Sequence, residues 1–316
     1  MAQTQTAEVT RLRPKGASPA IVPATNIGEA VHNLLKDGWT RLECPTLGRR
    51  YDTLIDSFLR MVSSPESEKY VIGAPRELDK DGEPDIGLIF KAKGQKKPHP
   101  RADEIAEGRT AYDSTKWTHH FKPRLLGYLD KTPGLLESHD TFFLESARMQ
   151  SEAALLMLEI AEEMDRAMPG YDFAQRFLLG DSKHVTRLLH YLCDGPAEIA
   201  QRHRDQCFIT GAIRSSRKGL WLVDNHGTII RSAEETRPDS ILIFFGRKAW
   251  EITRGRIQGI VHGVKDTSAH NPLTRKPRQS AIFFGHADVL PEEANWARDH
   301  MSDLTIPQHV EQWAKL

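Results

Sequence analysis

From residue 185 onward, the chain consists of short apolar or alternating runs separated by turn-forming residues. The runs cover residues 185–193, 207–213, 219–223, 228–231, 240–245, 249–253, 259–265 and 279–284. Segments of roughly four to eight such residues are typical of β-strands, and about eight of them in succession favour a sandwich or a barrel. The C-terminal part of the chain is therefore predicted to form a β-core.

The N-terminal part has mainly helical periodicity. Apolar residues recur at helical spacing from Asn26 to a stop at Gly38, from Tyr51 to Met61, and along the run from Thr141 to Met168. Residues 39–42 could begin a strand, and residues 1–20 are polar and rich in proline. We expect a flexible leader over 1–20, a helical part over 21–180 that packs on the core, and a core over 181–316 with a helical tail, all forming one unit.

Composition limits the classes of partner. The chain has 43 Lys plus Arg and 43 Asp plus Glu, so its overall charge favours neither nucleic acid nor an anionic membrane as a partner. No stretch approaches the roughly 20 apolar residues of a membrane span, and the first residues lack the apolar core of a secretory signal. Three widely spaced cysteines fit a reducing compartment, so we predict a soluble cytoplasmic protein.

Two polar stretches could be mistaken for binding sites. Charged residues dominate the region 70–100 around the apolar piece Gly87–Phe90, and such charge runs are usually solvated surface. His119 and His120 are adjacent, and neighbouring side chains on a regular element point apart. A shared metal ion is therefore not expected there, and aromatic packing or a place at the rim of a substrate pocket is the better interpretation.

The motif His203-Arg204-Asp205 supplies half of a possible metal site. In a strand, residues i and i+2 point to the same face, so an imidazole and a carboxylate would lie side by side. The motif is weak by itself, because His286-Ala-Asp288 repeats it. A helix-like segment follows that second pair, and we interpret the pair as structural.

His262 strengthens the first pair. It lies in the β-like run Ile260–Val264, which could return to the same end of the barrel. Two imidazoles and one carboxylate on one face leave coordination positions open, an arrangement suited to non-haem Fe(II) and the activation of O2. Zinc would more often use three histidines or cysteines.

Arg278 and Ser280 stand at the start of the last apolar run. Alternation places both on the face that Ile282 and Phe284 continue, so a guanidinium and a hydroxyl would lie at the edge of an apolar interior. An inward arginine requires an anion, and its planar fork matches a carboxylate. That carboxylate could belong to a ligand or to an Asp or Glu of the protein.

The order of these motifs resembles the isopenicillin N synthase-like branch of the 2-oxoglutarate/Fe(II)-dependent dioxygenases. The likeness covers about residues 185 to 285 well and the N-terminal part loosely. Its elements are, in order, His203-x-Asp205, Pro238–Gly246, Trp250-Glu251, Thr253–Gly255, His262-x-Val264 and Arg278-x-Ser280. The resemblance implies a mainly β fold with helices, a double-stranded β-helix (jelly-roll) core flanked by N-terminal helices.

The resemblance also implies roles for single residues. His203, Asp205 and His262 match the iron ligands, and Arg278 with Ser280 matches the pair that holds the distal carboxylate of 2-oxoglutarate. Tyr191 matches a second contact to this cosubstrate, although Leu189 departs from the asparagine that the family often has. Gly263 replaces a common basic residue, and the interval between His262 and Arg278 is longer than usual. An extended hairpin loop would accommodate the extra residues.

The implied activity is oxidation of a small organic substrate, by hydroxylation or desaturation, with O2 consumed and 2-oxoglutarate converted to succinate and CO2. Two alternatives remain open. The first is an Fe(II)/O2 oxidase or cyclase resembling isopenicillin N synthase that uses no 2-oxoglutarate. The second is a non-catalytic β-barrel that binds a ligand. Candidates for the pocket rim are Arg204, Gln206, Phe208, Trp221, Phe244, His119 and His120. The sequence specifies neither the substrate nor the oligomeric state.

Overall fold

The structure is a computed structural model that describes residues 21–65, 87–97, 100, 104–105, 109–122, 125, 135–194, 198–231, 239–265 and 276–304. The leader predicted over 1–20 and most of the charged region 70–100 lie outside these residues. The apolar piece within that region is strand β2. Within the described residues, no helix combines the length and the apolar character that crossing a membrane requires.

The predicted N-terminal helices are present. The longer helices are α1 (Ile27–Asp37), α2 (Pro45–Ser63) and α6 (Leu135–Ala167), followed by α7 (Phe173–Leu179) and the 3-10 turn η1 (Asp181–Lys183). The side chain of Asn26 accepts a hydrogen bond from the backbone N–H of Glu29 and begins α1. Gly38 ends it in the left-handed conformation (φ 83°), where glycine has no steric penalty.

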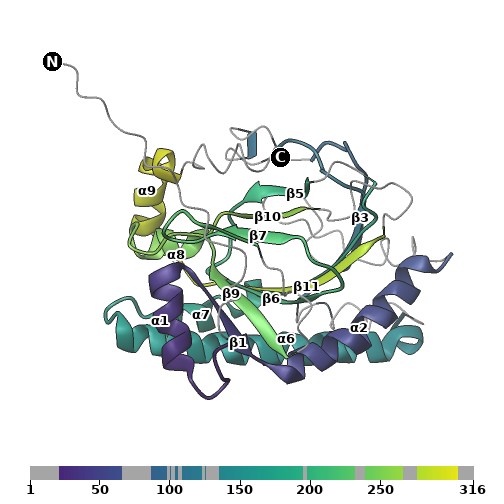
Figure 1. The fold of residues 1–316 in the computed structure, drawn as a ribbon, viewed down its shortest axis with the longest axis horizontal. Coiled ribbons are helices and arrows are strands. Elements are labelled where there is room, and N and C mark those ends of the chain that lie inside the picture. Colours follow the sequence, from purple (N-terminus) through teal and green to yellow (C-terminus); the bar gives the residue numbers. More distant parts are fainter. Residues whose placement is uncertain are drawn as a thin grey trace.

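Two antiparallel sheets form the centre of the molecule (Figure 1). The large sheet has the order β1-β9-β6-β11-β4-β3-β2, and the small sheet has the order β5-β10-β7-β8. The large sheet comprises β1 (Trp39–Glu43), β2 (Gly87–Lys91), β3 (Lys116–Phe121), β4 (Val185–Tyr191), β6 (Ile209–Ser215), β9 (Ser240–Phe245) and β11 (Arg278–Gly285). The small sheet comprises β5 (Glu198–His203), β7 (Leu220–Val223), β8 (Ile229–Arg231) and β10 (His262–Lys265).

Helices α1, α2 and α6 cover one face of the large sheet, along the bottom of Figure 1. The main hydrophobic core lies between these helices and that face, and β9 contributes Ile241, Ile243 and Phe245 to it. Leu242 and Phe244 point the other way, into a smaller core shared with the small sheet. Alternation along a strand therefore divides the large sheet into a helix-covered face and an inner face.

One predicted strand is wrong. Residues 249–253 belong largely to a short helix, α8 (Arg247–Ile252), which precedes α9 (Pro291–Asp299) and the 3-10 turn η3 (Met301–Leu304) in the chain. Ala249 and Ile252 are buried one helical turn apart, and Arg247 forms an i,i+4 ion pair with Glu251 (Nε to Oε1, 2.7 Å). A short apolar run is compatible with the periodicity of a strand and with that of a helix, and these contacts stabilise the helix.

Candidate metal centre and its cavity

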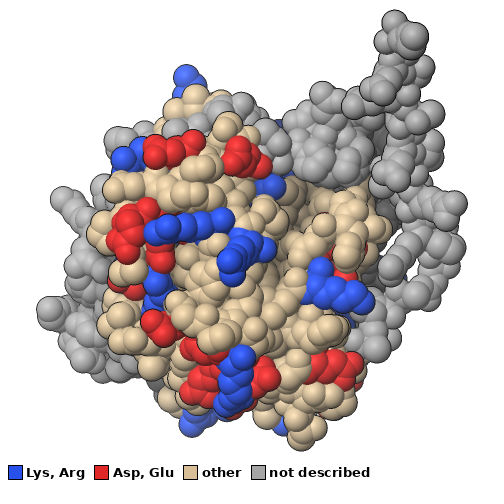
Figure 2. All heavy atoms as spheres, turned by 90° about the vertical axis from the view of Figure 1, so that its left-hand side faces the viewer, with Lys and Arg blue, Asp and Glu red and all other residues tan. Residues whose placement is uncertain are grey.

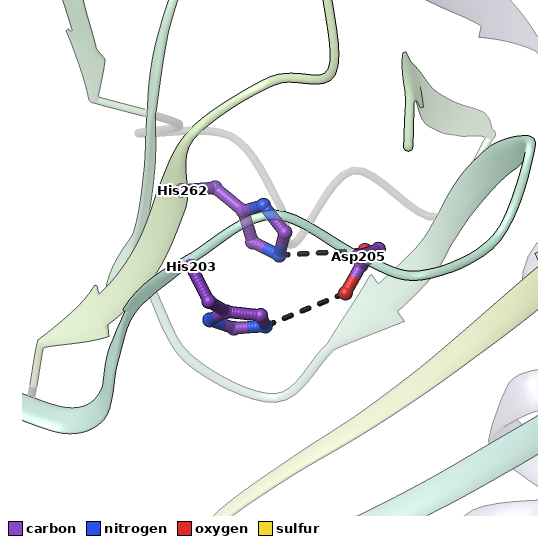
Figure 3. A group of neighbouring side chains, drawn as sticks. All are labelled: His203, Asp205 and His262. Carbon is purple, nitrogen blue, oxygen red and sulfur yellow. Dashed lines mark ion pairs between the residues drawn. The ribbon is translucent and has the colours of Figure 1, made fainter. Parts of the chain in front are cut away.

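His203, Asp205 and His262 lie together between the two sheets (Figure 3). His203 is the last residue of β5 and His262 is the first residue of β10, and the two are direct partners across the antiparallel pair. Their ring centroids are 4.4 Å apart. Two positions far apart in the chain therefore become neighbours through strand register, as the sequence predicted.

The position of Asp205 differs from the expected one. We expected it on the same strand as His203, but β5 ends at His203 and Asp205 lies in the loop that follows. Two hydrogen bonds hold Asp205 in this loop, one to its backbone and one to its side chain. The backbone N–H of Arg247 donates to the Asp205 carbonyl (2.7 Å), and the Thr210 hydroxyl donates to Asp205 Oδ2 (2.7 Å).

Both imidazoles present Nε2 to this carboxylate. His203 Nε2 lies 3.4 Å from Asp205 Oδ1, and His262 Nε2 lies 3.4 Å from Asp205 Oδ2. The opposite ring nitrogens face backbone carbonyls: His203 Nδ1 is 2.6 Å from the oxygen of Gln201, and His262 Nδ1 is 3.2 Å from that of Ile260. A carbonyl only accepts, so Nδ1 carries the proton and Nε2 keeps the lone pair that a metal needs.

The electrostatics favour the ligating forms of two of these side chains. Burial alone would raise the pKa of Asp205, but its interactions with His262, His203 and Thr210 hold that pKa well below the usual range. Burial lowers the pKa of His262 to about 4, against the opposing effect of Asp205. At neutral pH the site therefore contains an ionised carboxylate and a neutral imidazole at position 262.

The donor set fits a divalent metal ion. One ligand atom from each of the three residues lies within 4.8 Å of the others. Two nitrogen donors and one oxygen donor are too few to fill the coordination sphere of Fe(II), which leaves positions for small ligands. Within the described part of the chain, His286 and Asp288 are not in such a group: the backbone N–H of His286 donates to His184, and Asp288 forms an ion pair with Lys183.

The metal centre opens into a cavity of about 820 Å³. Arg278, Ser280 and Tyr191 all line it, and all three are buried. Arg278 and Tyr191 are direct partners across β11 and β4. The hydroxyl of Ser280 has no hydrogen-bond partner among the described residues, and burial raises the pKa of the Tyr191 phenol to about 12, so it keeps its proton.

The rim candidates divide into two groups. Arg204, Gln206, Phe244 and His120 line the cavity, whereas Phe208, Trp221 and His119 are not among its lining residues. Phe244 packs against His262 with ring centroids 4.7 Å apart. Arg204 is held by the carbonyl oxygens of Gly259 (2.9 Å) and Leu304 (2.8 Å).

Trp221 explains the glycine that follows the second histidine ligand. A Cβ on Gly263 would approach the Trp221 ring to 2.7 Å and the Ala200 carbonyl to 3.0 Å. Trp221 lies in a cluster with Val223 and Val261, apart from the core between the sheets. The departure from the family pattern at this position is thus a requirement of packing.

Sequence reasoning missed Thr210 and Arg187. Thr210 orients the Asp205 carboxylate from β6, and Arg187 lines the cavity from β4. The available signal was alternation: Arg187, Leu189 and Tyr191 share one face of a strand whose other residues Thr186 and Leu188 are buried.

No protein-family model matches the sequence, and a search of curated proteins finds no match. Among solved structures, the chain is similar to a full-length Neurospora crassa protein in complex with alpha-KG and thymine, with 16% identity, a TM-score of 0.60, and 89% of this chain and 91% of that protein covered. It is similar to DAO1, a dioxygenase for auxin oxidation from Arabidopsis thaliana bound to 2-oxoglutarate, with 13% identity, a TM-score of 0.60, and 86% and 94% covered.

A third structure is JOX2 in complex with 2OG, Fe and JA, with 15% identity, a TM-score of 0.60, and 90% of this chain and 81% of JOX2 covered. The fold of the chain is therefore that of 2-oxoglutarate- and iron-dependent oxygenases, as the resemblance of its motifs implied. At these identities the likeness concerns the fold, and the chemistry rests on the site itself.

Proposed function

We propose that the protein is a non-haem Fe(II)- and 2-oxoglutarate-dependent dioxygenase that hydroxylates or desaturates a small organic substrate and releases succinate and CO2. The observation that carries this proposal is the metal centre of His203, Asp205 and His262 at a cavity that also contains buried Arg278 and Ser280. The similar structures with bound cosubstrate support it.

In this proposal the side chains bind and orient, and none acts as a nucleophile. Fe(II) held by the three ligands would supply the oxidation of the substrate with O2 and 2-oxoglutarate. Arg278 offers a guanidinium fork to the distal carboxylate of 2-oxoglutarate, and the unpartnered Ser280 hydroxyl donates to the same group. The Tyr191 phenol, which stays protonated, is placed opposite Arg278 to donate a further hydrogen bond.

We further propose that the two sheets are the halves of a double-stranded β-helix, with the metal centre at one end. In this interpretation the N-terminal part (21–180) and the core (181–316) form one catalytic unit, since β1, β2 and β3 pair within the same sheet as β4, β6, β9 and β11. A cytoplasmic location stays a prediction from the sequence.

Anaerobic titration and product analysis test the function. Wild-type protein is expected to bind Fe(II), to bind 2-oxoglutarate in its presence, and to form succinate when O2 and a substrate are supplied. Fe(II) binding with substrate oxidation but no succinate would overturn the proposal and favour the 2-oxoglutarate-independent oxidase. Failure to bind Fe(II) would favour the non-catalytic alternative.

The cosubstrate contacts have a matched control. Ser280 and Ser146 are both buried serines whose hydroxyls have no partner among the described residues, but only Ser280 lines the cavity. Ser280→Ala is expected to weaken 2-oxoglutarate binding by about tenfold to 100-fold, the value of one hydrogen bond to a charged group. Ser146→Ala is expected to leave it unchanged. Equal effects of the two substitutions would remove Ser280 from the binding site.

A further inference from the structure

Strands β3 and β4 place polar side chains on the inner face of the large sheet, away from Arg278. Thr118 and His120 of β3 line the cavity, and Arg187 of β4 is the direct cross-strand partner of His120. Directly opposite residues in an antiparallel pair have Cβ atoms about 5 Å apart. Thr118, His120 and Arg187 therefore form one polar group, which we name the β3–β4 cluster.

Two buried atoms of the β3–β4 cluster lack partners. Thr118 is 2% exposed and His120 is 6% exposed. Thr118 Oγ1 and His120 Nε2 have no hydrogen-bond partner among the described residues. Buried polar atoms are nearly always satisfied, because an unmade hydrogen bond costs about 1–3 kcal/mol. Two such atoms on one wall of a cavity indicate a ligand that accepts or donates hydrogen bonds there.

The charge of the cavity indicates which ligand. Lys and Arg greatly outnumber Asp and Glu among the described residues that line it. Carboxylates of the protein balance some of them: Arg214 pairs with Asp52 (2.8 Å) and Arg247 with Glu251 (2.7 Å). By contrast, acidic and basic side chains are interspersed on the outer face shown in Figure 2, and the chain as a whole has equal numbers of both. The excess of positive charge is a local property of the cavity.

Within the β3–β4 cluster the charged side chain is Arg187. The guanidinium of Arg187 lies over the ring of Phe284, with Cζ 4.8 Å from the ring centroid. Burial, together with the nearby charges of Arg187 and Lys91, holds the pKa of His120 well below its usual range, so His120 is a neutral hydrogen-bonding group. An anion bound at the β3–β4 cluster would therefore meet one guanidinium and the two polar atoms that lack partners.

The β3–β4 cluster adjoins the metal centre and is separate from Arg278. Phe284, on which Arg187 lies, is the cross-strand partner of Thr210, whose hydroxyl binds Asp205. Arg187 pairs with Ile282, whereas Arg278 pairs with Tyr191, four positions further along each strand. At about 3.4 Å per residue this offset is roughly 14 Å, and Arg187 extends toward Phe284, away from Arg278, so the two guanidinium groups do not share one carboxylate.

We propose that the primary substrate is a small organic acid whose carboxylate binds Arg187, with hydrogen bonds from His120 and Thr118. This proposal rests on the proposed function, because it assigns Arg278 to 2-oxoglutarate and leaves Arg187 for the substrate. Two charge-assisted hydrogen bonds from the Arg187 guanidinium would hold the substrate carboxylate and direct the rest of the substrate past Phe284 toward the metal centre.

Calorimetric titration of the Fe(II)- and 2-oxoglutarate-loaded protein under argon tests the proposal. The probes are two isosteric pairs, phenylacetate with phenylacetamide and hexanoate with hexanamide. Wild-type protein is expected to bind at least one acid about tenfold more tightly than its amide. Arg187→Gln is expected to abolish that preference while the affinities for the amide and for 2-oxoglutarate stay the same.

Other variants keep the test informative. Arg187→Lys retains the charge but not the fork, and is expected to keep part of the preference. Thr118→Val removes no charge and is expected to lower the affinity for the acid about tenfold, the lower value for one hydrogen bond to a charged group. Arg214→Gln is the matched control, because this arginine also lines the cavity but lies on β6, outside the β3–β4 cluster, and it is expected to leave the preference intact.

Two results would overturn the proposal. The first is wild-type protein that binds no acid more tightly than its amide. The second is an Arg187→Gln variant that loses 2-oxoglutarate rather than the acid, which would assign Arg187 to the cosubstrate. If the proposed function is wrong, the protein will not bind 2-oxoglutarate even before any acid is added, and this result differs from the two above.

Discussion

The two faces of the large sheet carry different kinds of side chain from the same strands. On the helix-covered face, β11 buries Ala281 and Phe283 in the main core. On the inner face, the same strand presents Arg278 and Ser280 to the cavity. The adjacent residues His119 and His120 show the same division: His119 packs edge-on against Phe142 at 4.8 Å, and His120 lines the cavity. A single strand therefore serves stability with one set of residues and binding with the other.

The largest effect expected on the inner side is the loss of metal binding. Asp205→Ala removes the charged ligand and is expected to weaken Fe(II) binding by more than about 100-fold, because only two imidazoles remain. Calorimetry under argon measures this affinity. Asp288→Ala, the same change in the second His-x-Asp motif, is the control and should not alter it. Comparable losses in both variants would contradict the assignment of the metal centre.

The corresponding change on the helix-covered face should affect folding instead. Phe283 is fully buried in the main core, and Phe283→Ala is expected to lower the free energy of unfolding by about 3–5 kcal/mol. Phe284→Ala on the inner face should cost less than half as much, because its ring already borders the cavity. Urea denaturation measures both. An equal cost would show that the two faces do not differ in packing.

The pH dependence of the free energy of unfolding tests the burial of His119 as a neutral imidazole. Burial holds the pKa of His119 at about 3, below the usual 6.5, so between these values the unfolded chain binds a proton that the folded chain excludes. The free energy of unfolding therefore falls as the pH falls below 6.5, with His119 contributing up to about 1.4 kcal/mol per pH unit. His119→Leu should remove this part of the slope. An unchanged slope from about pH 6.5 to about pH 4 would contradict the burial of a neutral imidazole.

The smallest expected effect comes from removing the hydrogen bond that orients the Asp205 carboxylate. Thr210→Val removes the hydroxyl that donates to Asp205 but keeps the shape of the side chain, and it is expected to weaken Fe(II) binding about tenfold. The melting temperature without metal should change little, because the lost bond leaves Asp205 with its histidine contacts. A metal affinity equal to that of the wild type would show that the loop alone orients Asp205.

Features of the sequence with a clear physical pattern were predicted correctly. Strand β9 (Ser240–Phe245) is apolar after its first residue because both of its faces are covered, and alternation after Arg278 placed Ser280 on the same face. Helix α1 was predicted from its periodicity and its glycine stop. The meeting of His203 with His262 was predicted through the order of the strands and the family resemblance.

The remaining features depend on contacts that a linear pattern does not encode. Strand β5 reads Glu-Ile-Ala-Gln-Arg-His, and this polar composition kept it out of the apolar runs that predicted strands. Among the described residues it pairs with β10 alone. The run at 249–253 is too short to separate a helix from a strand. Alternation could place Arg187 on the inner face, but its contacts with Phe284 and His120 on the neighbouring strands could not be predicted from it.

The distribution of the three ligands over the fold has a mechanical consequence. His203 and His262 belong to the small sheet, whereas Asp205 is tied through Thr210 to β6 of the large sheet. An ion bound by all three would link the two sheets, and its binding free energy would add to the free energy of unfolding. Heat tolerance of this protein should thus rise with the concentration of free metal, independently of any turnover.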